Sequence, residues 1–271
     1  MKLINDFRQM NRDMEKITMI TAYDCFSAQI AQIANVDTIL VGDSLGMVIQ
    51  GEKTTIGVSI DDIIYHTKAV QNAINDTFVI SDMPYMTYHL DINTTKLNAA
   101  RIMRETRANA IKIEGGSQSR IEVICALNDC EIPVCGHLGL TPQSINMLGE
   151  YKVQGKTETE HELMLTQANM IEQAGAFMLV LECVPEELGK KISESLSIPV
   201  IGIGAGRYTD GQVMVWHDIL GMSNMTPKFV KKYIDLKQII AQQVGLYVSE
   251  VKGEKFPSKE HVYYPFENNK D

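Results

Sequence analysis

The chain has 271 residues, of which 45% are hydrophobic and 22% are charged, and these values are typical of a soluble globular protein. Its formal net charge of −9 argues against nucleic acid or an anionic membrane as the main partner, because both select basic surfaces. The sequence contains no Cys-x-x-Cys pair, no apolar signal-peptide core and no apolar run of about 18 residues. We therefore expect a reduced, cytoplasmic protein with no membrane span.

Short apolar runs recur along the chain and predict strands, and the segments between them predict helices. The expected strands are residues 17–23, 38–41, 77–81, 110–113, 132–139, 176–182, 198–203 and 212–216. The expected helices are residues 5–16, 25–34, 59–74, 94–106, 118–127, 157–173, a segment after Pro185, and 228–252. We expect Phe26, Ile30 and Ile33 to form the buried face of the helix over 25–34, and a polar tail from about residue 253.

Strands that alternate with helices indicate a parallel sheet, because parallel neighbours need a crossover connection. Eight such repeats in a chain of this length favour a closed (β/α)8 TIM barrel over an open doubly wound sheet. The sequence shows no internal repeat, low-complexity segment or linker. We therefore expect an α/β protein with one barrel domain over residues 1–271.

Charged side chains stand at the carboxyl ends of five successive predicted strands. They are Asp43, Asp82, Lys112, Glu114, His137 and Glu182. The active sites of such barrels lie at that end of the strands. Any one of these residues alone is explained as well by a helix cap or a rim charge. Several unpaired carboxylates in one buried site would repel one another, so a bound cation is the natural resolution.

The candidate metal ligands are carboxylate oxygens, which suit Mg²⁺ better than zinc. Lys112 and Glu114 lie two positions apart on one strand, so both side chains face the barrel interior while Ile111 and Ile113 face the helices. This spacing places a cation beside a carboxylate inside the barrel. A plain internal salt bridge is the alternative interpretation of the pair.

The site also needs a group that accepts a proton, and Glu182 and His137 are the two candidates. Glu182 ends an almost wholly apolar strand, where desolvation would raise its pKa, so we favour it as the general base. His137 lies between Gly136 and Gly139, which would let a ligand approach closely. The residues alone therefore predict metal-dependent proton abstraction beside a carbonyl.

Two further motifs carry weaker signals. The run Gly202–Gly206 follows the seventh strand, where barrels often bind phosphate, but it lacks the dinucleotide-binding pattern and favours a close-packed turn. Cys135 lies two positions before His137, which allows a thiol nucleophile beside a base. A buried structural cysteine is the simpler interpretation.

A series of motifs runs in register from about Ile17 to Asp218. They are residues 41–47 (VGDSLGM), 65–67 (YHT), 81–85 (SDMPY), 111–116 (IKIEGG), 136–143 (GHLGLTPQ), 151–155 (YKVQG), 181–185 (LECVP), 201–206 (IGIGAG) and 216–218 (WHD). Through these motifs the chain resembles the ketopantoate hydroxymethyltransferase (3-methyl-2-oxobutanoate hydroxymethyltransferase) family. The resemblance is looser beyond Asp218.

The resemblance implies a (β/α)8 barrel that binds Mg²⁺ and assembles as a homo-oligomer, a decamer in known bacterial members. It implies hydroxymethyl transfer from 5,10-methylenetetrahydrofolate to 3-methyl-2-oxobutanoate, which gives 2-dehydropantoate in pantothenate biosynthesis. By position, Asp43, Asp82 and Glu114 match the metal site, where Glu114 can act through water. Asp43, Ser44, Asp82 and Lys112 match the keto-acid site, and Glu182 matches the proton acceptor.

Two other functions stay open. One is a different metal-dependent keto-acid barrel, a lyase or an aldolase, which would turn over with no folate present. The other is a barrel that binds ligands without catalysis, for which loss of Glu182 or Asp82 would be the sign. Both carboxylates are present.

Overall fold

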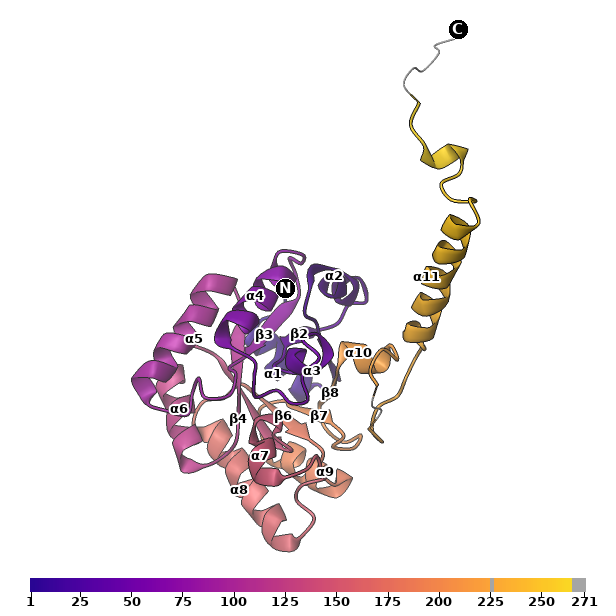
Figure 1. Cartoon of the computed structure of the whole chain (residues 1–271). Coiled ribbons are helices and arrows are strands. Elements are labelled where there is room, and N and C mark those ends of the chain that lie inside the picture. Colours follow the sequence, from indigo (N-terminus) through magenta and orange to yellow (C-terminus); the bar gives the residue numbers. More distant parts are fainter. Residues whose placement is uncertain (225–226, 265–271) are drawn as a thin grey trace. The chain divides into compact units, whose positions relative to one another are not determined.

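Eight parallel strands close into a barrel in the computed structural model, which describes residues 1–224 and 227–264 (Figure 1). The strands are β1 (Ile17–Thr21), β2 (Thr38–Val41), β3 (Phe78–Asp82), β4 (Ala110–Glu114), β5 (Val134–Gly139), β6 (Met178–Glu182), β7 (Val200–Ile203) and β8 (Gly211–Met214). Each strand pairs with the next along the chain, and β1 pairs with β8. This topology confirms the predicted (β/α)8 TIM barrel.

Helices between consecutive strands lie outside the barrel (Figure 1), and further helices precede the first strand and follow the last. They are α1 (Ile4–Arg12), α2 (Cys25–Ile33), α3 (Leu45–Val48), α4 (Ile60–Gln71), α5 (Ile92–Thr106), α6 (Gln118–Asn128), α7 (Ile145–Leu148), α8 (Glu158–Gln173) and α9 (Glu186–Ser195), followed by α10 (Trp216–Ile219) and α11 (Leu236–Lys252). Two 3₁₀ turns, η1 (Pro142–Ser144) and η2 (Lys259–His261), complete the list. Side-chain caps fix several starts: Ser59 accepts the Asp62 backbone N–H, and Thr157 accepts that of Glu160.

Some predicted details are wrong. In α2, Phe26 and Ile33 are 70% and 78% exposed, and the buried face consists instead of the small residues Ser27, Ala28 and Ala31. The helix expected over 228–252 begins only at Leu236. The helix expected over 94–106 begins at Ile92, because the Asp91 carboxylate caps it by accepting the Thr94 backbone N–H. The last strand ends at Met214, and Trp216 begins α10.

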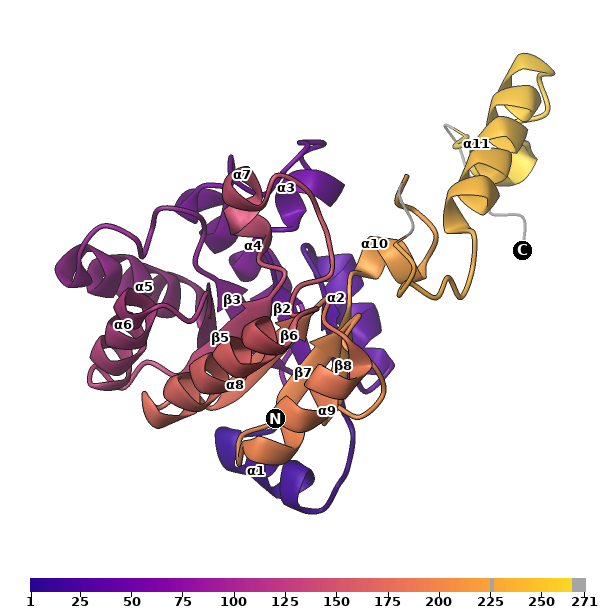
Figure 2. The ribbon, with the colours of Figure 1, turned by 90° about the horizontal axis from the view of Figure 1, so that it is seen from below.

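The amino end of the barrel is closed by aromatic packing. The Phe7 ring of α1 meets the Phe78 ring edge-on at 5.1 Å, and Phe78 lies 5.8 Å from Phe177. Figure 2 shows α1 at this end of the barrel and α3 and α7 at the opposite end. These three rings belong to one buried apolar cluster.

The described residues divide into two compact units. The larger unit runs from Met1 to Trp216, with a short later segment that ends at Val230, and the smaller unit holds α11. The expectation of one domain over residues 1–271 stays a prediction. Among the described residues, no helix is long and apolar enough to cross a membrane.

Helix α9 approaches the chain after β7 so closely that only glycine fits at position 189. A Cβ at Gly189 would lie 2.3 Å from the Ala205 carbonyl oxygen, which belongs to the backbone and cannot rotate away. We expect Gly189→Ala to destabilise the fold by about 1–3 kcal/mol in urea unfolding, because the clash outweighs the gain in helix propensity. Gly57→Ala, whose added Cβ meets nothing within 4 Å, is the matched control. Equal midpoints for the two variants would contradict the expectation.

Candidate active site

A buried cluster of charged side chains lies at the carboxyl end of the barrel. Asp43, Asp82, Lys112, Glu114 and His137 are each only 2–4% exposed. Strand register explains their proximity, because Asp82 pairs with Lys112 across β3 and β4, and Glu114 pairs with His137 across β4 and β5. Ile111 and Ile113 belong to the core cluster shared with the helices, as the alternation along β4 predicts. The structure thus brings the predicted residues of β2 to β5 together.

Lys112 is the centre of this cluster. Its Nζ lies 3.1 Å from Asp82 Oδ1, 3.5 Å from Glu114 Oε1 and 3.2 Å from His137 Nδ1. One ammonium group therefore contacts two carboxylates and an imidazole, which is more than an isolated salt bridge. Burial opposes the charge, but Asp82, Glu114 and Asp43 outweigh it and raise the pKa of Lys112 well above its usual value. Lys112 is a permanent cation of the site.

The carboxylates respond to their neighbours in opposite ways. Burial, together with the charges of Asp82 and Glu114, raises the pKa of Asp43 well above its usual range. Burial also raises the pKa of Asp82, although Lys112 opposes this shift. For Glu114, the charges of Lys112 and His137 outweigh burial and lower the pKa to about 2. Asp43 is therefore the carboxylate that protein cations compensate least.

The surroundings of Asp43 and Asp82 suit a divalent cation. Asp43 donates its backbone N–H to Asp82 Oδ2 at 2.9 Å, and no described residue donates a hydrogen bond to Asp43 Oδ1. Within residues 1–224 and 227–264, no three His, Cys, Asp or Glu side chains are spaced to hold an ion by themselves. Mg²⁺ usually takes one or two carboxylates and completes its shell with water and substrate oxygens, so this donor set fits it.

Glu114 is engaged by the protein on both of its oxygens. Oε1 lies 3.3 Å from His137 Nδ1, and Oε2 accepts the Gln143 backbone N–H at 3.1 Å. The other ring nitrogen of His137, Nε2, lies 3.3 Å from Glu182 Oε2. Burial and Lys112 act to lower the pKa of His137, but the carboxylates on either side outweigh them and raise it to about 9. His137 therefore links the proposed metal site to Glu182.

The remaining predicted residues lie at the edge of the cluster. The Glu182 side chain is 17% exposed, so it reaches the open end of the barrel. Ser44 follows Asp43, and its hydroxyl lies 2.8 Å from the hydroxyl of the buried Tyr23. Ser44 makes no cap hydrogen bond to α3, so the contact with Tyr23 is what orients its hydroxyl.

Two residues of the site were missed by the sequence analysis as functional positions. Gln143 follows β5 in η1, and its side chain donates to Asp43 Oδ2 at 2.8 Å. The Tyr88 hydroxyl donates to Gln143 Oε1 at 2.7 Å and accepts the Glu114 backbone N–H at 3.1 Å. Gln143 is the last residue of the motif 136–143, which was the only sequence signal for its role. Tyr88 lies in none of the family motifs, so the sequence carried no signal for it.

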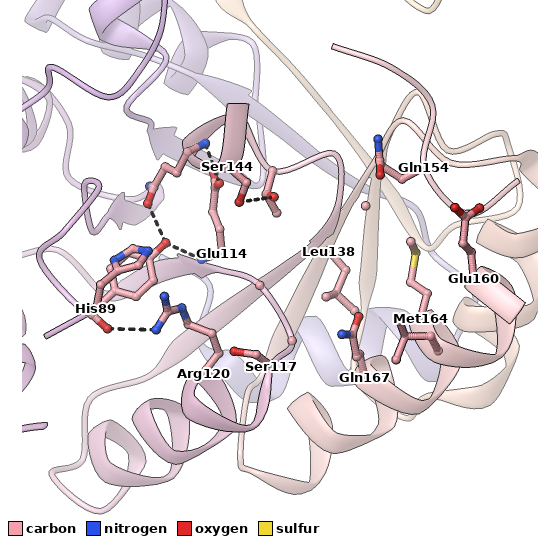
Figure 3. Close-up of a pocket in the computed structure, with 18 residues that line it drawn as sticks. His89, Glu114, Ser117, Arg120, Leu138, Ser144, Gln154, Glu160, Met164 and Gln167 are labelled. Atoms are coloured by element: carbon pink, nitrogen blue, oxygen red, sulfur yellow. Dashed lines mark hydrogen bonds between the residues drawn. The ribbon is translucent and has the colours of Figure 1, made fainter. Parts of the chain in front are cut away.

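A cavity of about 410 Å³ lies beside the cluster (Figure 3). Glu114 and Gln143 form part of its wall, and Arg120, Glu160 and Met164 line it from α6 and α8. Figure 3 shows Glu114 hydrogen-bonded on the side away from Glu160 and Met164. The carboxylate cluster and this cavity therefore share one wall.

The two weaker motifs have structural explanations. Burial raises the pKa of the fully buried Cys135 thiol to about 12, which disfavours a thiolate nucleophile. In the run Gly202–Gly206, a Cβ at Gly204 would lie 2.9 Å from the Phe229 ring, and one at Gly206 would meet Glu186 at 2.5 Å. These contacts fit the close-packed turn.

Residues 2–259 match the sequence family described as ketopantoate hydroxymethyltransferase. The 3-methyl-2-oxobutanoate hydroxymethyltransferase of Shouchella clausii (strain KSM-K16) is 48% identical over 264 residues, which cover 97% of this chain and 94% of that protein. Among solved structures, a phosphonopyruvate hydrolase complex with oxalate and Mg²⁺ has a TM-score of 0.64 at 9% identity and covers 98% of this chain and 93% of its own. A 2,3-dimethylmalate lyase of the PEP mutase/isocitrate lyase superfamily has a TM-score of 0.59 at 14% identity, and the match covers 96% of this chain and 91% of the lyase.

Proposed function

Because the chain belongs to the ketopantoate hydroxymethyltransferase family, we propose that its barrel site transfers a hydroxymethyl group from 5,10-methylenetetrahydrofolate to 3-methyl-2-oxobutanoate with the help of Mg²⁺. The relative at 48% identity supports the transferase class, the keto acid and a place in pantothenate biosynthesis. The ion and the folate are the further parts of the proposal. The solved complex of the phosphonopyruvate hydrolase, a barrel of the same fold, holds Mg²⁺ with the two-carbon diacid oxalate.

The observation that carries the proposal is the buried pair Asp43 and Asp82 beside Lys112. Asp43 and Asp82 would hold Mg²⁺, and Glu114 would support it through water because its own oxygens are already engaged. When bound, the ion would supply Lewis-acid stabilisation of the negative charge that develops on the keto oxygen. Lys112 and Ser44 would bind the substrate carboxylate, which orients the C3–H bond in the site.

Glu182 would remove the proton from C3. The carboxylates of Glu114 and Glu182 lie 3.3 Å from the two ring nitrogens of His137 and raise its pKa to about 9, which favours a protonated ring over a general base. It would instead hold Glu182 in place. The carbanion at C3 would then form the new C–C bond to the one-carbon unit of the folate. Overall, both C–N bonds of that unit break, one water supplies the hydroxyl group of 2-dehydropantoate, and the proton from C3 and one proton from water end on the two nitrogens of the released tetrahydrofolate.

The first test is proton exchange. 3-Methyl-2-oxobutanoate in D₂O with the protein and Mg²⁺, without folate, is expected to lose its C3-proton NMR signal, and EDTA is expected to stop the loss. Addition of 5,10-methylenetetrahydrofolate should then yield 2-dehydropantoate. If no exchange occurs with or without folate, the reaction proposed here is wrong. Conversion of the keto acid with no folate would favour the lyase or aldolase alternative.

The proposal includes a cytoplasmic location and assembly as a homo-oligomer, with a decamer expected from the resemblance. Sedimentation velocity of the purified protein measures the assembly directly. The substrates are small molecules, and neither nucleic acid nor a membrane is a proposed partner.

A further inference from the structure

We propose that Gln143 is the positioning residue of this site: its amide and backbone N–H hold Asp43 and Glu114 in the orientation that binds the divalent cation. The inference rests on the proposed metal site. It concerns a residue that lies on none of the eight strands and carries no charge, yet contacts the carboxyl ends of three of them.

The Gln143 side chain uses both of its N–H donors and its oxygen in hydrogen bonds. Nε2 donates to Asp43 Oδ2 at 2.8 Å, after β2, and to the Met83 carbonyl at 3.0 Å, after β3. Oε1 accepts the Tyr88 hydroxyl at 2.7 Å. Two acceptors facing the nitrogen and one hydroxyl facing the oxygen leave a single amide orientation.

The contacts close into a ring. The Gln143 backbone N–H donates to Glu114 Oε2 at 3.1 Å, the Glu114 backbone N–H donates to the Tyr88 hydroxyl at 3.1 Å, and the Tyr88 hydroxyl donates to Gln143. Gln143 and Tyr88 are 4% and 1% exposed, so water does not compete for these bonds. The side chain of Asp43 is attached to this ring through a single donor, Nε2.

The chemistry of the position excludes most substitutes. A glutamate would bring a carboxylate next to Asp43, which is already the least compensated acid of the cluster. A methionine has about the same length but no N–H donor and only a weakly accepting sulfur, so it keeps the volume, removes both Nε2 hydrogen bonds and weakens the contact with Tyr88. Outer-shell partners of metal ligands typically change metal affinity by about 10–100-fold when they are lost.

The test is direct cation binding. Mn²⁺ is titrated into wild type, Gln143→Met and Gln167→Met, with 3-methyl-2-oxobutanoate present and folate absent, and free Mn²⁺ is followed by EPR. Gln167 lines the same cavity but is outside the ring, so it is the matched control. We expect Gln143→Met to bind Mn²⁺ about 10-fold more weakly or worse, with an unchanged circular dichroism spectrum, and Gln167→Met to bind within twofold of wild type.

The outcomes separate this inference from the proposed function. Equal affinities of wild type and Gln143→Met would overturn the positioning role and leave the reaction standing. Wild type that binds Mn²⁺ but does not exchange the C3 proton with or without folate would contradict the reaction, while weaker Mn²⁺ binding by Gln143→Met would still support the positioning role. Wild type that binds no Mn²⁺ overturns both the metal site and this role. If Gln143→Met does not fold, Tyr88→Phe opens the ring at its other side and must weaken Mn²⁺ binding, or the role is wrong.

Discussion

Glu182→Gln is expected to slow exchange of the C3 proton of 3-methyl-2-oxobutanoate by about 10²–10⁴-fold, because a general base contributes roughly that much. The amide has nearly the shape of the carboxylate but accepts no proton at neutral pH. Asp43, Asp82 and Lys112 are untouched, so Mn²⁺ and keto-acid binding should stay near wild type. NMR exchange in D₂O measures the rate, and EPR titration measures the binding.

The control is Glu187→Gln, which makes the same chemical change at an exposed position of α9 outside the site. It should exchange at the wild-type rate. If Glu182→Gln also exchanges at that rate, the base is a different group, and His137→Gln becomes the next variant to measure. If it loses metal binding instead, Glu182 belongs to the metal site.

Lys112→Met is expected to be the most destabilising substitution in the site. Removal of one partner from a buried charge pair costs about 3–5 kcal/mol, because it leaves a charge that is neither solvated nor paired. Here the ammonium contacts Asp82 and Glu114 at once, so the upper part of that range applies. Urea unfolding monitored by circular dichroism gives the free energy.

The same exchange at the surface supplies the comparison. Lys68 pairs with Glu105 at 3.3 Å, but its side chain is 47% exposed, so Lys68→Met should cost no more than about 1 kcal/mol. The double variant Lys112→Met with Asp82→Asn should recover part of the lost stability, because one of the unpaired charges is then absent. A Lys112→Met protein as stable as Lys68→Met would show that Lys112 does not neutralise the buried acids.

The barrel could be predicted from the sequence because the pattern of hydrophobic residues is periodic. Alternating strand and helix patterns recur along the chain, and the two-residue spacing of Lys112 and Glu114 fixes which way they face. The same logic predicted that acids at strand ends would meet. Residue type was less informative for α2. The large apolar residues Phe26 and Ile33 suggested the buried face of this helix, but they are exposed, and the small residues of α2 are buried instead.

Gln143 and Tyr88 could not be assigned a role in the same way. They follow strands rather than end them, and no periodicity relates a loop residue to the atom it contacts. Asp43 and Gln143 are 100 residues apart and meet only because the barrel brings the loops after β2 and β5 together. Uncharged polar residues also carry no electrostatic signal, so their function becomes visible only when donors and acceptors are counted in three dimensions.

The pairing of β1 with β8 has a consequence for synthesis on the ribosome. Ile17 pairs with Gly211, so the first strand has no second neighbour until nearly 200 residues more have been made. Every proposed catalytic and metal-binding residue, up to Glu182, emerges before that closing strand. The nascent chain thus carries its complete set of reactive groups on an open sheet with exposed edges, and contacts of such long sequence separation form slowly. Folding during synthesis should therefore include one late step, in which β8 pairs with β1 and completes the barrel around these groups.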